Sequence, residues 1–332
     1  MWTLAIDAMG GDNAPKDIIE GTLEALEQNK NIKVLMYGIE KEIKKHMPTT
    51  HERITIIDCP EVIETCEAPL IAIRKKVNSS LIKGLLAVKS KEADAFISAG
   101  STGAVMAGAL FKVGRIRGID RPALAPVLPT KQGNALLIDC GANADCEVKF
   151  LEQFALMGSA YMELVEGVEN PRAGLINIGA EEEKGNALYK KTYKALEVLD
   201  GINFVGNIEA RDVTEGGADV LVCDGFTGNI VLKTLEGMAL YLFSMIKEQI
   251  MKNPIRKLGA LLMKNGFREV KGKLDHKEHG GAPLLGIKGC VIKAHGSSDA
   301  SAFHGAMKQA VKYLDGDVTN VIKQKIEGMN EE

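Results

Sequence analysis

Short apolar runs alternate with amphipathic stretches along most of this chain. The runs lack a regular alternation with polar residues, which is typical of strands buried on both faces. They occupy residues 32–38, 54–58, 95–100, 135–141, 174–179, 202–207 and 220–225. Helical spacing of apolar positions recurs between them, at 15–28, 79–91, 101–113, 149–166, 184–199 and 298–314. The alternation predicts a three-layer α/β/α fold with a mostly parallel sheet.

Polar residues gather where the predicted strands end. Nearly every apolar run closes on Gly, Asp or Asn. In open parallel sheets, ligands bind beyond the carboxyl ends of the strands. We therefore expect the loops along one edge of the sheet to form the binding site.

The segment from about 236 to 278 interrupts this pattern. It contains no clear strand, and Pro254 fits the first turn of a helix better than a helix interior. The sequence therefore predicts two helices separated near Asn253. We expect residues 1–332 to form a single unit, with an α/β core at 1–235 and 279–332 and a helical protrusion at about 236–278.

The protrusion is strongly basic. Residues 247–273 contain eight Lys or Arg and two Glu, a net charge of +6 that leaves −9 for the rest of the chain. From Ile255 onward, apolar residues share one helical face and cations lie opposite. Such a helix can rest on an anionic membrane, pack in a dimer or attract an acidic partner, and the helices at 236–263, rich in Leu and Met, can line a groove for an apolar chain. The sequence leaves these alternatives open. The candidate contacts are Arg256, Lys257, Leu258, Leu262, Lys264 and Arg268.

Composition narrows the classes of function. The chain has 35 glycines in 332 residues, against a usual share of about 7%, and only 5% aromatics. This balance fits an α/β enzyme, and it does not fit a stacking platform for nucleic acid. The net charge of −3 likewise gives no basic field for nucleic acid. Six cysteines without a CxxC pair indicate reduced thiols and a cytoplasmic location.

Two segments resemble each other. Residues 92–104 align without gaps on 217–229, and both read as a strand, a glycine turn and a helix start. Two tight turns can converge because both need glycine. Alternatively, Thr102 and Thr227 belong to two loops that present N–H groups and hydroxyls to one anion.

Other polar side chains follow predicted strands without any nucleotide-binding or metal-ligand signature. Hydroxyls, amides and cations in these places are common helix caps. Taken together, they favour a site for a polyanion such as phosphate. These clusters contain Lys184, Asn186, Asn207, Glu209, Arg211, Asp224, Thr227, Asn229, Lys233, His295, Ser297 and Ser298.

The glycine turn at residues 6–17 is a poor phosphate cradle. Its carboxylates, Asp7 and Asp12, would repel the ligand. Gly10 and Gly11 permit a tight turn before the helix start at Asn13. We therefore expect this loop to form a wall of the site, with a structural role for Asp7 as plausible as a catalytic one.

A set of motifs from Ile6 to about Phe303 resembles the bacterial phosphate acyltransferases of phospholipid synthesis. The motifs are "DAMGGDNAP", "ISAGSTGA", "GRIRGIDRPALAPVLPT", "DCGAN", "NIGAEEEKGN", "GNIEARD", "DGFTGNIVLKTLEG", "GGAPLLG" and "HGSSD". That family makes acyl phosphate from acyl-(acyl carrier protein) and inorganic phosphate. The chain departs from the family at Ser101, where Asn is usual, and at His279, where an aromatic residue is usual.

The resemblance carries several further implications. It implies a fold similar to phosphotransacetylase and the isocitrate and isopropylmalate dehydrogenases, and a homodimer without metal or redox cofactor. It also implies reversible association with the inner face of the cell membrane. There a membrane glycerol-phosphate acyltransferase would use the product.

The residues and the resemblance together give a hypothesis for the site. Phosphate attacks the thioester carbonyl directly, so the enzyme must supply position and charge neutralisation. We expect Lys184 and Asn229 to act on phosphate or the oxyanion, and His295 to protonate the leaving thiolate. The phosphate- and substrate-binding candidates are Asp7, Gly10, Gly11, Ser98, Gly100, Ser101, Thr102, Asn143, Asn186, Arg211, Asp224, Thr227, Lys233 and Ser297.

Three rival interpretations remain. A phosphotransacetylase-like enzyme would use acyl-CoA in place of the carrier protein. A hydroxyacid dehydrogenase of the same fold would need a metal-binding carboxylate set and an adenosine pocket, which the motifs do not show clearly. A non-catalytic scaffold recruited to the membrane would bind carrier protein without making acyl phosphate.

Overall fold

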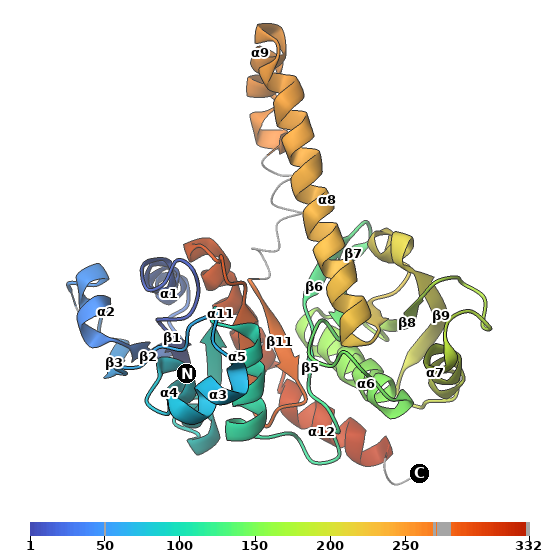
Figure 1. The fold of residues 1–332 in the computed structure, drawn as a ribbon, viewed down its shortest axis with the longest axis horizontal. Coiled ribbons are helices and arrows are strands. Elements are labelled where there is room, and N and C mark those ends of the chain that lie inside the picture. The colour runs from blue at the N-terminus through green and yellow to red at the C-terminus, as the bar shows by residue number, and fades with distance from the viewer. Residues whose placement is uncertain (50, 268–269, 271–279, 330–332) are drawn as a thin grey trace.

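Two α/β bodies lie side by side, and one long helix projects from them (Figure 1). The computed structural model describes residues 1–49, 51–267, 270 and 280–329. The strands are divided between a seven-stranded sheet and a five-stranded sheet. The expected α/β architecture with mostly parallel strands is confirmed, although the strands form two sheets where the sequence suggested one.

The first sheet has the order β3-β2-β1-β4-β12-β11-β5. Its strands β3, β2, β1, β4 and β12 run parallel, and β11 pairs antiparallel with both β12 and β5. The parallel strands therefore end along one edge. The strands are β1 (Trp2–Asp7), β2 (Ile32–Gly38), β3 (Ile54–Asp58), β4 (Ala95–Ser98), β5 (Ala123–Leu124), β11 (Gly281–Leu285) and β12 (Cys290–Ala294).

The second sheet has the order β6-β7-β10-β8-β9. Only the β6–β7 pair is antiparallel, so β7, β10, β8 and β9 also end along a common edge. The strands are β6 (Val127–Thr130), β7 (Gly133–Ile138), β8 (Arg172–Asn177), β9 (Asn203–Glu209) and β10 (Val220–Val222).

Helices cover both bodies. In the first body they are α1 (Lys16–Gln28), α2 (Glu40–His46), α3 (Pro69–Lys75), α4 (Ser80–Ser90), α5 (Thr102–Gly108) with a π-helical turn (Ala109–Val113), and α11 (Ala300–Asp315). Helix α12 (Val318–Met329) follows α11 and packs against α6 (Val148–Val165) of the second body. The second body also contains α7 (Ala187–Glu197) and a 3-10 turn (Ala210–Glu215). After β10 the chain continues into α8 (Gly225–Met251) and then α9 (Pro254–Leu262). The six helices that the sequence predicted in the two bodies lie close to their expected bounds, whereas α2, α3 and α12 were not expected.

Alternate residues of the first sheet feed two different cores. On β1, Leu4 and Ile6 pack in one hydrophobic cluster, and Ala5 packs in another on the opposite face with residues of α4 and α5. This period of two is the geometry of a strand buried on both sides. The sequence shows it as an apolar run without polar alternation.

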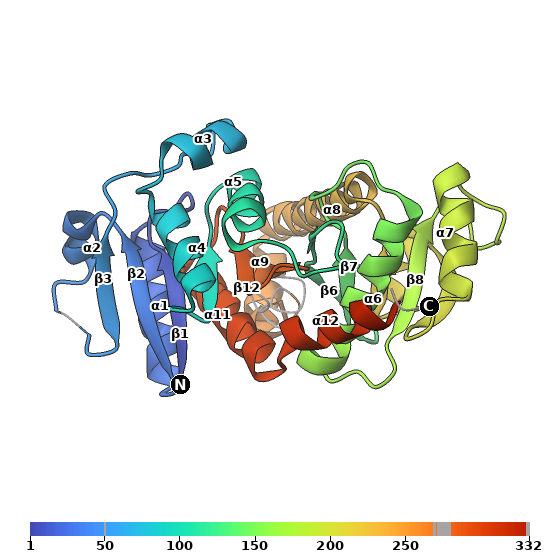
Figure 2. The ribbon, with the colours of Figure 1, turned by 90° about the horizontal axis from the view of Figure 1, so that it is seen from below.

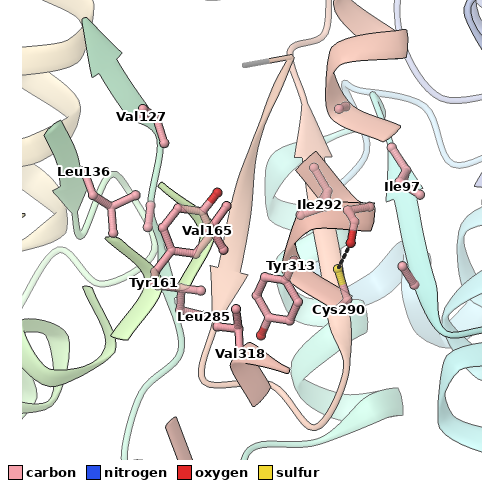
Figure 3. Close-up of a cluster of buried hydrophobic side chains, with 14 of the residues drawn as sticks. Ile97, Val127, Leu136, Tyr161, Val165, Leu285, Cys290, Ile292, Tyr313 and Val318 are labelled. Carbon is pink, nitrogen blue, oxygen red and sulfur yellow. Dashed lines mark hydrogen bonds between the residues drawn. The ribbon is translucent and has the colours of Figure 1, made fainter. Parts of the chain in front are cut away.

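One core extends between the two bodies. Figure 3 shows Tyr161 of α6 beside Leu285 of β11 and Tyr313 of α11. The rings of Tyr161 and Tyr313 lie 6.5 Å apart, and Gln309 donates a hydrogen bond to the Tyr161 hydroxyl at 2.9 Å. This continuous packing fixes the two sheets relative to each other.

The helix break near Asn253 is found where the sequence placed it. Helix α8 ends at Met251, and α9 begins at Pro254, where the Asn253 side chain accepts a bond from Ile255 N at 2.8 Å. Within the described part of the chain, α8 is the one helix long and apolar enough to cross a membrane, judged by length and composition alone. Its first turns are anchored in the second body, where Gly228 and Val231 are buried.

Candidate active site

Loops from both bodies approach each other at the carboxyl ends of the parallel strands. The Asn143 amide, which follows β7, donates to the carbonyl of Pro122 beside β5 at 2.8 Å. Lys233 on α8 is near enough to Lys293 on β12 for its charge to disfavour the ionised form of Lys293. The candidate site therefore combines strand ends from both sheets, with the first turns of α8 between them (Figure 1).

Three polar side chains form a row across β1, β4 and β12. Ser98 pairs in register with Lys293, and Asp7 follows Ile6, which pairs with Ile97. The Ser98 hydroxyl donates to Asp7 Oδ2 at 2.7 Å and accepts from Gly100 N at 3.0 Å. Ser98 and Gly100 are thus engaged in bracing their own turn, where they were expected to contact phosphate.

The next two residues of this turn remain available to a ligand. Ser101 and Thr102 begin α5, and the side chain of Ser101 does not cap the helix. Thr102 is exposed, and Ser101 is partly exposed. In the described residues neither hydroxyl has a hydrogen-bond partner. They are the donors of the first body best placed to meet an anion.

The opening glycine loop packs against the same turn. A Cβ on Gly10 would lie 2.6 Å from Asp7 Oδ2 and 2.7 Å from Gly100 N, so only glycine fits there. Gly11 has a φ of +104°, which also favours glycine. Asp12 N donates to the carbonyl of Gly296 at 2.8 Å, which joins this loop to the one after β12. The loop thus packs against the turns after β4 and β12, and its role as a wall of the site stays a prediction.

The loop after β12 carries two of the expected site residues. His295 and Ser297 are exposed, and His295 Nδ1 lies 2.9 Å from Ser297 Oγ. Ser298, also named from the sequence, is buried, and its hydroxyl has no hydrogen-bond partner among the residues that the structure describes. His295 is therefore at the surface near the strand ends, within reach of an entering substrate.

Lys293 is a site residue that sequence reasoning missed. Its side chain is 7% exposed, and its ammonium donates to the carbonyls of Ala99, at 3.4 Å, and Ala294. Burial lowers the pKa of Lys293 to about 8, although the negative charges of Asp7 and Asp12 act to raise it. Burial also raises the pKa of Asp7, although hydrogen bonds from Ser80 and Ser98 act to lower it. The available signal was a lysine inside the apolar run "CVIKA".

Asp224 holds the first turn of α8 in the second body. Its carboxylate accepts from Thr227 N at 2.8 Å, from the Thr227 hydroxyl at 2.9 Å and from the Tyr189 hydroxyl at 2.5 Å. Asp224 thus acts as the N-cap of α8, and Thr227 donates to it from the first turn. Tyr189, which carries no motif signal, was also missed by the sequence reasoning.

Asn229 follows in the same first turns and has an open amide. It is exposed, and among the described residues it has no hydrogen-bond partner. Its Oδ1 lies 3.7 Å from the position of a Cβ on Gly141, in the loop after β7. Asn229 is therefore a donor held by a well-braced helix start.

The loop that carries Lys184 is tied to the ends of β8 and β9. Asn177 donates to the carbonyl of Lys184 and to Asn207 Oδ1, both at 3.1 Å. Asn207 in turn donates to the carbonyl of Glu181 at 2.8 Å. The side chain of Lys184 is 46% exposed, and its ammonium is 3.9 Å from Glu181. The backbone is thus fixed while the ammonium can meet a substrate.

The expected donors Asn143 and Asn186 have structural partners. Asn143 Nδ2 donates to the carbonyl of Pro122 and, at 3.1 Å, to Asp139 Oδ2. Asn186 Oδ1 caps α7 by accepting from Tyr189 N at 3.1 Å. Asn143 therefore joins the two sheets, whereas the Nδ2 of Asn186 is not used in that cap.

Asp139 is a second buried carboxylate that the sequence did not single out. It accepts from Leu124 N at 2.9 Å and from Asn143 N at 2.6 Å. Burial raises the pKa of Asp139 to about 6, although these hydrogen bonds oppose the shift. Since Leu124 belongs to the first sheet, Asp139 joins the two halves of the site.

Two further cations already have acidic neighbours. Lys233 contacts Glu236 at 2.7 Å. Arg211 contacts Glu209 at 3.1 Å and Asp212 at 3.7 Å, with 75% of its side chain exposed. Both are thus less available to an anion than Lys184.

The outer end of the helical protrusion, which includes α9, lies far from these loops (Figure 1). Leu258 is 61% exposed and Leu262 83% exposed, so the apolar face of α9 has no cover within the described chain. Arg256 bonds the Gln249 carbonyl at 3.3 Å, and Lys257 and Lys264 are exposed. Arg268 and His279 lie outside the described residues.

Sequence comparison assigns the family. A family model described as fatty acid synthesis protein matches residues 2–321. A phosphate acyltransferase from Thermoanaerobacter pseudethanolicus is 51% identical over 329 residues, 99% of this chain and 98% of the relative. A phosphate acyltransferase from Clostridium tetani is 49% identical over 326 residues, 97% of each chain.

Solved structures support the fold. A phosphotransacetylase from Streptococcus pyogenes has a TM-score of 0.60 at 16% identity, and the match covers 98% of this chain and 94% of that one. A branched-chain phosphotransacylase from Enterococcus faecalis has a TM-score of 0.58 at 14% identity, with 95% and 100% covered. Both confirm the expected phosphotransacetylase-like fold. Together with the near-full-length relatives, these findings show that this chain belongs to the phosphate acyltransferase family, enzymes that transfer an acyl group to phosphate.

Proposed function

We propose that the protein transfers a long-chain fatty acyl group from acyl-(acyl carrier protein) to inorganic phosphate, giving acyl phosphate for glycerophospholipid synthesis. The observation that carries this proposal is the pair of matching turns at the strand ends. Ser101 and Thr102 come from one turn, Asn229 from the other, and Lys184 from the loop after β8. These hydroxyl, amide and ammonium donors suit a tetrahedral anion.

The reaction needs no enzyme nucleophile. A phosphate oxygen attacks the thioester carbonyl carbon, and the electron pair of the carbonyl moves to its oxygen. When this oxyanion collapses, its electron pair re-forms the C=O bond, the C–S bond breaks, and the carrier's thiolate leaves with the electron pair of the C–S bond. The thiolate then takes a proton, so the products are acyl phosphate and the free thiol of the carrier protein.

Lys184 and Asn229 have the main catalytic roles in this proposal. The ammonium of Lys184 offsets the repulsion between phosphate and the developing oxyanion, and Asn229 donates a hydrogen bond to one of them. Fixing both reactants in place contributes up to roughly 7–11 kcal/mol. His295, at the surface beside Ser297, is the proposed proton donor to the thiolate.

Acyl-CoA is the alternative donor, because the similar solved structures include phosphotransacetylases. The two donors are separated by measuring kcat/KM for acyl phosphate formation with palmitoyl-(acyl carrier protein) and with palmitoyl-CoA. The proposal expects the carrier-protein thioester to be preferred by at least about tenfold, a difference of about 1.4 kcal/mol. An equal or higher kcat/KM with palmitoyl-CoA would reject the proposed donor.

The helical pair is the proposed contact surface of the molecule. In this proposal the α/β core at 1–235 and 279–332 carries the chemistry, and the protrusion at about 236–278 makes contacts. The exposed apolar side chains of α8 and α9, Leu240 and Leu262 among them, fit a homodimer or the surface of an anionic membrane. The protein would be cytoplasmic and reversibly bound to the inner face of the cell membrane. A membrane glycerol-phosphate acyltransferase would receive its product there.

A further inference from the structure

The charges of the first body are unevenly distributed along the sequence. Residues 68–91 and 95–119 contain no Asp or Glu. Their net charge is therefore +9, although the whole chain has a net charge of −3. The nine cations are Arg74, Lys75, Lys76, Lys83, Lys89, Lys91, Lys112, Arg115 and Arg117.

Seven of the nine cations lie in α3, α4 and the π-helical turn or directly at the ends of these helices, and Arg115 and Arg117 lie in the loop that follows. The two ranges contain α3, α4, β4, α5 and the π-helical turn, and α4 and α5 pack with α3 and this turn on the side of the sheet opposite α1 and α11. We call this surface the α3–α5 face. Helix α3 stands out from the body beside α5 (Figure 2).

The α3–α5 face borders the candidate active site. A Cβ on Gly103 would lie 2.7 Å from the ring of Pro69, so the first residue of α3 lies directly against the start of α5. Thr102, the open hydroxyl of the first body, is the preceding residue. A partner seated on α3 would therefore sit next to the site of chemistry.

Helix α3 presents apolar and charged groups together. Leu70 is 52% exposed and Ile71 is 56% exposed. Arg74 and Lys75 follow in the last turn, both exposed, and neither forms an ion pair with any residue that the structure describes. By contrast, Lys76 is paired with Glu67 at 2.5 Å. Exposed apolar side chains next to unpaired cations are typical of a surface that binds an acidic protein.

We propose that the α3–α5 face is the docking surface for the acidic carrier protein that delivers the acyl thioester. The inference rests on the proposed function for the identity of the partner. Leu70 and Ile71 contact the apolar part of the carrier surface, and Arg74 and Lys75 pair with its carboxylates. The thioester arm then reaches the turn at Ser101 and Thr102 past Pro69.

A membrane fits this face less well than a protein does. The exposed apolar face of α9 lies at the far end of α8, whereas α3, α4 and α5 lie on the body (Figure 1). A flat bilayer that contacts α9 would not extend along the α3–α5 face. The helical pair and the α3–α5 face are thus separate surfaces, and they can serve the membrane and the carrier protein at once.

Charge reversal on α3 tests the proposal. The affinity of palmitoyl-(acyl carrier protein) is measured by surface plasmon resonance at low salt for the wild type and for Arg74→Glu/Lys75→Glu. We expect the Kd to rise by about tenfold or more, because attraction becomes repulsion at two rim positions. A second variant, Leu70→Ser/Ile71→Ser, removes only the exposed apolar groups, and we expect it to weaken binding without changing its salt dependence.

The matched control is Lys190→Glu/Lys191→Glu. These two lysines are also adjacent, exposed and on a helix, but α7 lies at the opposite end of the molecule from α3 (Figure 2). We expect its Kd to stay within about twofold of the wild-type value, since rim charges act locally at a screening length of about 10 Å.

Three results would overturn the docking proposal. The first is an unchanged Kd in Arg74→Glu/Lys75→Glu. The second is loss of carrier binding in Arg256→Glu/Lys257→Glu alone, which would place the carrier on the helical pair. The third is loss of vesicle binding without loss of carrier binding in the α3 variant, which would assign the face to a membrane. Failure of the proposed function is a different result: carrier binding that depends on Arg74, without formation of acyl phosphate.

Discussion

The Tyr189 hydroxyl is the clearest single test of how the second half of the site is built. It is buried and donates to the Asp224 carboxylate at 2.5 Å, while Asp224 keeps its two bonds from Thr227. A hydrogen bond to a charged group contributes about 1.5–3 kcal/mol. Because Asp224 retains partners, we expect Tyr189→Phe to lower the free energy of unfolding by about 1.5–2 kcal/mol, at the low end of that range.

We also expect Tyr189→Phe to lower kcat. Asp224 fixes the first turn of α8, and Asn229 lies in that helix start. If about half of this loss in bracing free energy also raises the activation barrier, kcat falls about three- to sixfold. Unfolding is measured by urea titration, and kcat by thiol release at saturating phosphate and acyl-(acyl carrier protein).

Tyr193→Phe is the matched control. Tyr193 lies one turn further along α7, and its hydroxyl has no hydrogen-bond partner in the described part of the chain. Its ring packs edge-on against Phe204 at 5.2 Å. We expect this variant to stay within about 0.5 kcal/mol of the wild type. If Tyr189→Phe were equally silent in both stability and kcat, the bracing role assigned to Tyr189 and Asp224 would be refuted.

Three further predictions concern single features of the molecule. Lys184→Ala should lower kcat/KM by more than about tenfold, or 1.4 kcal/mol, with an unchanged circular dichroism spectrum, because the anion loses its cation. A smaller loss would show that Lys184 is not the main cation. Lys293→Met should change the pH dependence of unfolding. The pKa of Lys293 is lowered to about 8 in the folded protein, from 10.5. The unfolded state therefore binds more protons between those values, and the wild type should gain about 2–3 kcal/mol over the variant as pH rises from 8 to 10.5. Parallel curves would contradict the buried, charged Lys293. Leu258→Glu with Leu262→Glu should abolish co-sedimentation with phosphatidylglycerol vesicles while activity in solution persists, since charge replaces the exposed apolar face of α9. Retained vesicle binding would remove α9 from the membrane surface.

The sequence predicted the order of strands and helices well. Runs such as 95–100 and 220–225 were recognisable because their strands, β4 and β10, are buried throughout and have no polar positions to confuse the period. The strands at 123–130 and 281–294 were not expected. Pro126, Pro129 and Pro283 interrupt these stretches, and glycines at 281 and 286 flank the second one. The division into two sheets depends on antiparallel pairs of β11 and β6, which no local pattern encodes.

The sequence predicted which polar residues lie near the candidate site better than it predicted what each of them does there. Ser98, Asp224 and Asn143 were named because polar groups at strand ends suggest ligands. In the structure they bond to neighbouring backbone and side chains, which is the usual alternative for such groups at helix starts. Lys293 and Tyr189 were missed because their importance arises from long-range contacts. Periodicity and motif spacing carry no information about such contacts.

The central claim is direct transfer of the acyl group from the carrier protein to bound phosphate. Enzyme in excess is mixed with palmitoyl-(acyl carrier protein) in a quench-flow instrument, with and without radiolabelled phosphate, and carrier thiol and labelled acyl phosphate are counted together. The account predicts equal amounts of both products with phosphate, and no thiol release without it. Release of one thiol per active site in the absence of phosphate would reveal a covalent acyl-enzyme and contradict the account.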